Sequence, residues 1–129
     1  MIPVCSLAVL RDIKPNITLL GELEQSGGFF SSHVFALETF DAAHRTHARH
    51  FAASAGIAED PFTGSATGGM GAYLWKYGLI REPSFTVEQG HIIGRPGIGE
   101  VQVEGIGDEP TVVRIAGTAI TVLRGVLEV

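Results

Sequence analysis

The fold is decided by one stretch of the chain, GSATGGMGAYLWKY at residues 64–77. Apolar residues recur there at helical spacing, at Ala66, Met70, Tyr73, Leu74 and Tyr77. Glycines occupy positions 68, 69 and 71 of the same pattern. Each interior glycine destabilises a helix by about 1 kcal/mol relative to alanine, so three of them indicate that another backbone approaches closely. We therefore predict a buried central helix.

Downstream of this helix the sequence is typical of short strands separated by turns. Strands are predicted at residues 85–88, 98–103, 111–116 and 120–129. Val101 and Val103 alternate with Gln102 and Glu104, which is the pattern of a sheet with one buried face. The glycine-rich helix can cover that face. The sequence thus predicts an α+β fold in which a curved, mostly antiparallel sheet wraps around a central glycine-rich helix.

Upstream of the central helix, the pattern predicts three more strands and one more helix. The strands are expected at residues 3–7, 30–37 and 49–52, and a loop is expected over residues 54–63. Asn16 opens a helix in which Ile17, Leu20 and Leu23 share a face, and Gly27-Gly28 ends it.

Size and composition restrict the classes of protein to consider. A chain of 129 residues suits one domain, residues 1–129, and a net charge of −5 without a basic stripe argues against nucleic acid as a partner. The apolar run at residues 2–10 is interrupted by Ser6 and ended by Arg11-Asp12, so it predicts neither a signal peptide nor a membrane span. A single cysteine, Cys5, excludes an internal disulfide. We expect a cytoplasmic protein.

The segment that carries chemistry is GIAEDPFTGSA, residues 56–66. A helix N-terminus presents unpaired N–H groups, so the amides of Gly64, Ser65 and Ala66 can bind a substrate carboxylate or another anion. Asp60 lies just before that terminus, where it can act as a general acid or base on the anchored substrate. The alternative is that Asp60 and Thr63 only cap the next helix, which is the commoner role for these residue types.

Further motifs surround this segment in a fixed order. They are residues 20–27, Arg49-His50-Phe51-Ala52, Gly71-Ala72-Tyr73-Leu74, Glu88-Gln89-Gly90, Gly94-Arg95-Pro96-Gly97, Gly117-Thr118-Ala119 and Gly125-Val126-Leu127. Together with residues 56–66 they resemble the C-terminal half of PhzF-like (phenazine biosynthesis-like) isomerases, which have the diaminopimelate-epimerase-like fold. The resemblance covers nearly the whole chain.

The resemblance implies a fold of two similar halves with substrate in the cleft between them. It assigns the acidic catalytic role to Asp60 and carboxylate binding to Gly64, Ser65 and Ala66, and it implies no cofactor. The glutamate and the Gly-Asn-Pro motif of the family's N-terminal half are absent, since Asn16 is the only asparagine. Cys5 lies far from the motif, which argues against a two-cysteine epimerase mechanism.

Other candidate sites are weaker. The run formed by His44, His47 and His50 could approach a metal on a helical face. The resemblance instead puts the run in a loop leading to a strand, with His47 facing away from His50, and we expect no metal site. Residues 64–71 lack the Gly-Lys-Ser or Gly-Lys-Thr of a phosphate loop. His91 and Arg95 are expected to have turn and strand-end roles.

Two functional classes follow for this chain. The first is a cofactor-independent isomerase that moves a proton on a small carboxylate-bearing metabolite, either as a homodimer or with a separate chain that supplies the N-terminal half. In a homodimer, Glu59 or Glu88 could supply the opposing acid or base. The second class is a non-catalytic remnant or anion-binding module of the same fold. Homodimerisation is expected because a half domain exposes an apolar face and sheet edges that need cover.

Overall fold

The computed structural model describes residues 1–128, and it contains strands, three helices and two short 3-10 turns in that range. The strands are β1 (Ile2–Pro3), β2 (Ser32–Ala36), β3 (His47–Ala52), β4 (Ile57–Asp60), β5 (Ser84–Gln89), β6 (Gly97–Ile106) and β7 (Glu109–Ala116). The helices are α1 (Leu7–Asp12), α2 (Ile17–Gly27) and α3 (Gly64–Lys76). The 3-10 turns are Ala53–Ala55 and His91–Ile93.

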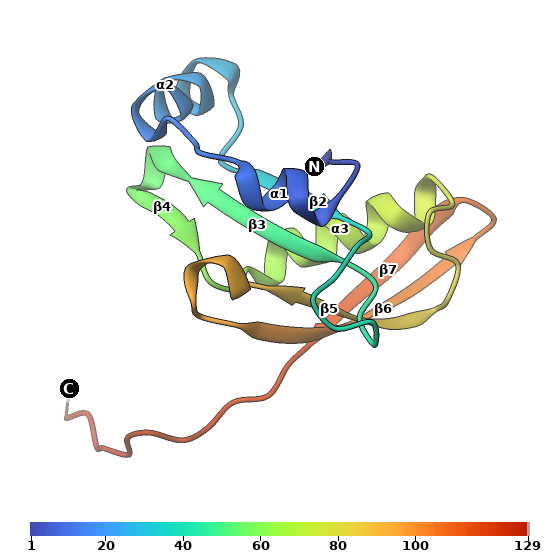
Figure 1. Cartoon of the computed structure of the whole chain (residues 1–129). Coiled ribbons are helices and arrows are strands. Elements are labelled where there is room, and N and C mark those ends of the chain that lie inside the picture. Colours follow the sequence, from blue (N-terminus) through green and yellow to red (C-terminus); the bar gives the residue numbers. More distant parts are fainter. Residues whose placement is uncertain (129) are drawn as a thin grey trace.

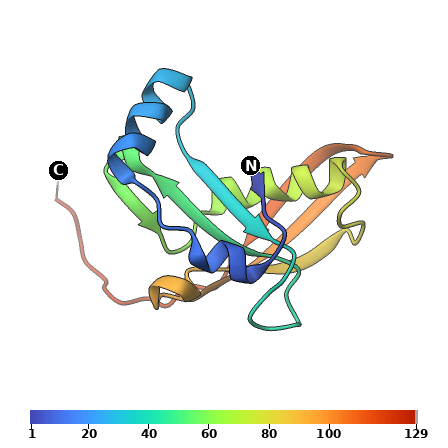
Figure 2. The same ribbon diagram turned by 45° about the horizontal axis from the view of Figure 1, so that its top comes forward.

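Within this range the strands form one mixed sheet in the order β1-β2-β3-β5-β6-β7, and β4 also pairs with β3. The β1–β2 and β3–β5 pairs are parallel. The β2–β3, β3–β4, β5–β6 and β6–β7 pairs are antiparallel. Figures 1 and 2 show the sheet curving along α3. The α+β fold with a mostly antiparallel sheet around the glycine-rich helix is therefore confirmed.

The glycines of α3 leave room on the helix surface for side chains of the sheet. A Cβ added at Gly71 would lie 2.7 Å from Val101 Cγ1, and one at Gly68 would lie 3.6 Å from Ile115 Cγ1. Met70 and Leu74, on the same helix, are fully buried. The prediction of a buried helix is confirmed, while the predicted backbone-to-backbone approach is replaced by valine and isoleucine side chains of β6 and β7.

Both faces of the central strands are covered. In Figure 1, α1 lies in front of β2 and β3, and α3 lies behind them. The core on the α3 side includes Phe35, Ala48 and Leu74. The core on the α1 side includes Leu10 and Phe51. Because successive strand residues point to opposite faces, β2 and β3 each contribute to both cores.

Two expectations for the first third of the chain need correction. The predicted strand at residues 3–7 ends after Pro3, because the Ser6 side chain accepts a hydrogen bond from the Val9 amide and starts α1. Helix α2 agrees with the prediction, but Leu23 is 56% exposed while Glu24 is buried. Glu24 Oε2 accepts a hydrogen bond of 2.7 Å from the Ser54 amide, which explains why a carboxylate occupies the inner face.

Two other predictions were wrong, and strand pairing decided the outcome in both cases. The predicted loop at residues 54–63 contains β4, which pairs with β3. The predicted strand at residues 120–129 has no partner, and residues 117–128 form no helix or strand. Val129 lies outside the described residues.

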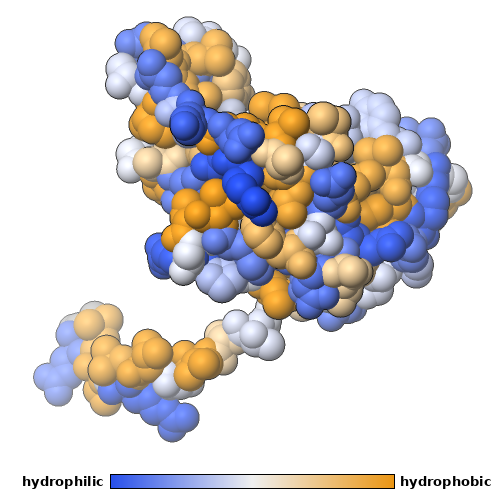
Figure 3. Space-filling model, viewed as in Figure 1, coloured by the Kyte–Doolittle hydropathy of each residue, from blue (hydrophilic) through white to orange (hydrophobic). Residues whose placement is uncertain are grey.

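The segment after β7 leaves the body of the protein with apolar side chains exposed. Figure 3 shows it as a separate extension with hydrophobic atoms on its surface. The side chains that are at least 85% exposed are Ile120, Val122, Leu123, Val126 and Leu127. Among residues 1–128, none of the helices has the length and apolar character needed to cross a membrane.

Candidate functional site

Asp60 is the last residue of β4 and lies next to the start of α3. The antiparallel β3–β4 ladder pairs it with His50. Its carboxylate accepts a hydrogen bond from the Thr63 hydroxyl. The following turn therefore holds the carboxylate in place. Asp60 is half-buried, so it also keeps some contact with solvent.

A buried glutamine holds the turn between Asp60 and α3. Gln89 Nε2 donates a hydrogen bond of 2.8 Å to the backbone carbonyl of Asp60 and one of 3.3 Å to Thr63 Oγ1. The next residue, Gly90, has φ +84°, and a Cβ there would lie 2.5 Å from the carbonyl oxygen of Pro61. The Gln89-Gly90 pair thus fixes the turn that presents Asp60, a role that the sequence motif alone did not reveal.

The N-terminus of α3 keeps its first amides free among the residues that the structure describes. Thr63 is the N-cap residue, but its side chain makes no capping hydrogen bond. Gly64 and Ser65 are exposed, Ala66 is half-buried, and no described group accepts a hydrogen bond from their amides. Neither side chain caps the helix with a hydrogen bond, because the Thr63 hydroxyl donates to the Asp60 carboxylate instead.

Two buried histidines lie behind Asp60 on the α3 face of the sheet. His33 Nδ1 lies 3.2 Å from His50 Nδ1 across the β2–β3 ladder. Burial, together with the neighbouring His50, lowers the pKa of His33 from 6.5 to about 3. Burial also lowers the pKa of His50, and this effect exceeds the opposing attraction of Asp60. The pair presents neutral imidazoles to the back of the site.

We expect acid to destabilise the protein through His33. Above pH 6.5 the His33 ring is neutral in both the folded and the unfolded chain. Its burial therefore contributes fully to the free energy of unfolding there. Between pH 6.5 and about 3 the unfolded chain binds a proton that the folded chain does not bind. Stability should therefore fall as the pH is lowered through this window, by up to about 1.4 kcal/mol per pH unit from this residue.

Urea unfolding at several pH values between 5 and 7 measures this slope, and His33→Gln removes the titrating group. The variant should show a shallower dependence of unfolding free energy on pH than the wild type. Parallel curves for the two proteins would show that His33 is not the source of the slope.

Neither of the two glutamates considered as an opposing acid or base is free. Glu59 forms two hydrogen bonds with Arg49, of 2.9 Å from Nε and 2.7 Å from the second terminal nitrogen. Arg49 also donates to the carbonyls of Leu10 and Ile13, which ties β3 to α1. Glu88 is buried and accepts hydrogen bonds from the Phe40 and Asp41 amides. Both carboxylates hold the fold together.

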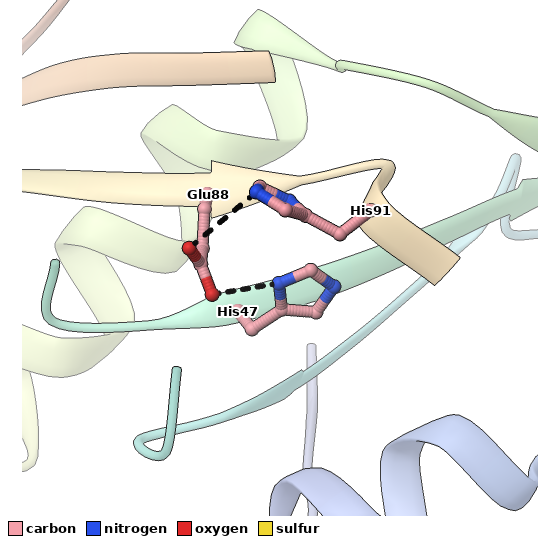
Figure 4. A group of neighbouring side chains, drawn as sticks. All are labelled: His47, Glu88 and His91. Atoms are coloured by element: carbon pink, nitrogen blue, oxygen red, sulfur yellow. Dashed lines mark hydrogen bonds and ion pairs between the residues drawn. The ribbon is translucent and has the colours of Figure 1, made fainter. Parts of the chain in front are cut away.

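The run of three histidines does not converge on one point. His47 and His50 both lie in β3, three positions apart, so they face opposite sides of the sheet, whereas a loop was expected for His47. His44 Nδ1 lies 2.8 Å from Thr86 Oγ1. His47 instead meets Glu88 and His91 (Figure 4). Sequence reasoning missed this group, because it depends on the parallel pairing of His47 with Glu88.

Arg95 stands in the turn after the Gly90 bend. Its backbone amide donates to the Gly90 carbonyl at 2.9 Å, and the residue is exposed.

A surface hollow close to the start of α3 is lined by Phe62, Pro96, Gly97, Ile98, Gly117 and Thr118. Gly64 and Ser65 are exposed, so the free amides at the start of α3 lie at an open surface.

Known proteins with similar sequences are isomerases. The chain is 38% identical over 131 residues to an uncharacterized isomerase of Clostridium acetobutylicum, covering 98% of this chain and 43% of that protein. It is 34% identical over 116 residues to the trans-2,3-dihydro-3-hydroxyanthranilate isomerase of Pseudomonas chlororaphis, covering 88% of this chain and 42% of that protein. The chain thus spans about two fifths of the length of the relatives it matches.

Solved structures and a family model point the same way. A PhzF-family phenazine biosynthesis protein of Bacillus anthracis superposes with a TM-score of 0.75 at 36% identity, covering 90% of this chain and 40% of that one. A predicted epimerase of Pseudomonas aeruginosa gives a TM-score of 0.55 at 30% identity, covering 92% and 41%. The model of the phenazine biosynthesis-like proteins matches residues 1–125. The chain therefore belongs to the phenazine biosynthesis-like (PhzC-PhzF) family.

Proposed function

We propose that the chain forms the carboxylate-binding part of a cofactor-independent isomerase. In this proposal Gly64, Ser65 and Ala66 donate their amide hydrogens to the carboxylate of a small metabolite. Asp60 then exchanges a proton with a carbon or heteroatom near that carboxylate. The amides position the substrate next to Asp60, and such positioning of the reacting groups accelerates the reaction.

The observation that carries the proposal is the pairing of the Thr63 hydroxyl with Asp60. A threonine at the N-cap normally accepts a hydrogen bond from the helix, but here it donates to the carboxylate. The helix start is left with open amides, and its positive dipole end favours an anion. At the same time the hydroxyl orients the acidic group toward the same end of the helix.

The amide donors and the relatives support a substrate class for this proposal. Free amides at a helix start recognise a carboxylate without identifying the rest of the molecule. One relative is named for an isomerisation of a hydroxyanthranilate, which is a carboxylate-bearing compound. We therefore propose a small carboxylate metabolite for this chain.

In this proposal, the opposing acid or base that completes the site comes from outside the described residues. Glu59 and Glu88 are occupied by Arg49 and by backbone amides. The exposed apolar segment after β7 supports an association that covers it. We propose that a second copy of the chain or a separate N-terminal-half chain supplies the opposing acid or base, in the cytoplasm.

The same observation favours a second candidate, a module that binds an anion without turnover. A chain whose other carboxylates are engaged in the fold can bind through its helix amides and still lack a second proton-transfer group. Light scattering on the purified chain bears on this choice. A stable monomer at micromolar concentration would leave binding alone, or a separate partner chain, in place of a homodimeric enzyme.

We expect an anion to bind at the start of α3. Titration of 15N-labelled protein with sodium sulfate, at ionic strength kept constant with sodium chloride, should shift the amide resonances of Gly64, Ser65 and Ala66 in a saturable way. The reason is that these amides have no acceptor among the described residues.

The start of α2 provides an internal control in the same titration. There the Asn16 side chain already accepts a hydrogen bond of 3.1 Å from the Leu19 amide, so that helix start is capped. Its resonances should stay in place. Linear, non-saturating shifts, or equal shifts at both helix starts, would contradict an anion site at α3.

A further inference from the structure

A second polar cluster lies on the opposite face of β3 from Asp60. It consists of His47 on β3, Glu88 on β5 and His91 on the 3-10 turn that follows β5. One ligand atom from each residue lies within 4.8 Å of the other two. Figure 4 shows both imidazole rings turned toward the carboxylate of Glu88.

The separations within this cluster suit a shared ion. His47 Nδ1 forms a hydrogen bond of 3.0 Å with Glu88 Oε1, and His91 Nε2 lies 3.7 Å from Glu88 Oε2. Two ligand atoms bound to one tetrahedral zinc ion are about 3.3 Å apart, given metal–ligand bonds of about 2.0–2.1 Å. The second separation is too long for a hydrogen bond, yet a small side-chain rotation would bring it to the ligand spacing.

The charge of the cluster also calls for a cation. The side chains of His47 and Glu88 have no exposed area. Among the residues that the structure describes, no lysine or arginine forms an ion pair with Glu88. The ion-pair partners of Glu88 are the two histidines, and a divalent ion bound between them and the carboxylate would offset the cost of its burial.

The surroundings hold the three groups in place. The amides of Phe40 and Asp41 donate hydrogen bonds to the two oxygens of Glu88, which orients the carboxylate as an outer shell does in metal sites. The Phe40 ring stacks on His91 with centroids 5.1 Å apart and meets His47 edge-on at 4.9 Å. Phe40 is 45% exposed and His91 is partly exposed, which leaves an entry path for an ion.

The ring orientations add a further observation. His47 Nε2 and His91 Nδ1 are buried and have no hydrogen-bond partner among the described residues. The polar contacts of both rings are therefore those that face Glu88. Two imidazoles and one carboxylate form the ligand set of several catalytic zinc sites, in which the fourth position is open.

We propose that His47, Glu88 and His91 bind one zinc ion, which ties β3 to β5 and to the 3-10 turn that follows β5. The site is separate from the proposed anion site, because His47 and Asp60 belong to opposite faces of the sheet. Zinc binding can thus be measured without any turnover assay, and its failure would leave the anion site unaffected.

Isothermal titration of the metal-free full chain with zinc chloride tests the proposal. We expect saturable binding of one zinc ion per chain, and cobalt(II) should give visible d–d absorption bands with the same stoichiometry. Because zinc binds the folded state, it should also raise the thermal midpoint. His91→Ala, which removes the least buried ligand, should weaken zinc binding by at least about 100-fold.

Two further variants test whether zinc binds to this cluster or to other histidines. His44→Ala, outside the cluster, should bind zinc like the wild type. Glu88→Gln should bind zinc weakly even where its fold, checked by circular dichroism, is retained. No saturable zinc binding by the wild type, equal affinity in His91→Ala, or loss of binding in His44→Ala would each overturn the proposal.

Discussion

Asp60→Asn is expected to lower the rate of proton exchange between solvent and a carboxylate substrate by about 100- to 10,000-fold. This is the range for removal of a general acid or base. Asparagine keeps the shape of the side chain and can still accept the hydrogen bond from Thr63, so the fold should be retained. Incorporation of deuterium into small carboxylates in heavy water, followed by NMR, measures the rate in the assembled protein.

A matched substitution separates chemistry from a general change of charge. Asp108 lies exposed in the turn between β6 and β7, and Asp108→Asn removes the same charge away from the helix start. Its exchange rate should equal that of the wild type. If Asp60→Asn also keeps the wild-type rate, Asp60 has no part in the proton transfer, whereas anion binding at α3 would still stand on its own test.

The second large effect concerns Arg49, the residue that joins β3, β4 and α1. Its guanidinium binds both oxygens of Glu59 and two backbone carbonyls, and it lies 5.1 Å from the centroid of the Phe51 ring. The Arg49 side chain is 7% exposed. Arg49→Met leaves the Glu59 carboxylate without its partner in a largely buried setting. We expect a loss of about 3–5 kcal/mol in the free energy of unfolding.

An exposed ion pair of similar length provides the control. Arg45 binds Glu82 at 2.8 Å, but the two side chains are 48% and 52% exposed. Arg45→Met should therefore cost less than about 1 kcal/mol in urea unfolding. The double variant Arg49→Met, Glu59→Gln should recover part of the loss, because no charge is then left unpaired. Equal costs for Arg49→Met and Arg45→Met would show that burial does not strengthen the Arg49–Glu59 pair.

The local sequence pattern was sufficient to predict β6 and α3. Alternation along Val101 and Val103 marked the buried face of β6, and helical spacing with three glycines marked α3. The resemblance of residues 56–66 to the family motif pointed to Asp60 and the start of α3. These predictions depend on periods of two and 3.6 residues, which the chain carries within one element.

Local pattern failed where pairing with a distant segment decides the structure. Residues 57–60 contain two acidic side chains and no clear alternation, yet they form β4 because β3 offers an edge. The apolar residues after β7 have strand composition but no strand beside them among residues 1–128. Strand propensity reflects packing against neighbours more than an intrinsic backbone preference, so neither outcome could be read from composition.

Local sequence patterns predicted the α+β class and the central helix, and the resemblance of residues 56–66 to the family placed Asp60 just before the start of α3. Three side-chain contacts could be found only in the folded chain: Thr63 with Asp60, His33 with His50, and His47 with Glu88 and His91. The His33–His50 and His47–Glu88 contacts depend on cross-strand register, and a shift of one residue would turn each of these side chains to the other face. Register is fixed by the packing of both cores against α1 and α3, which no single segment of the sequence specifies.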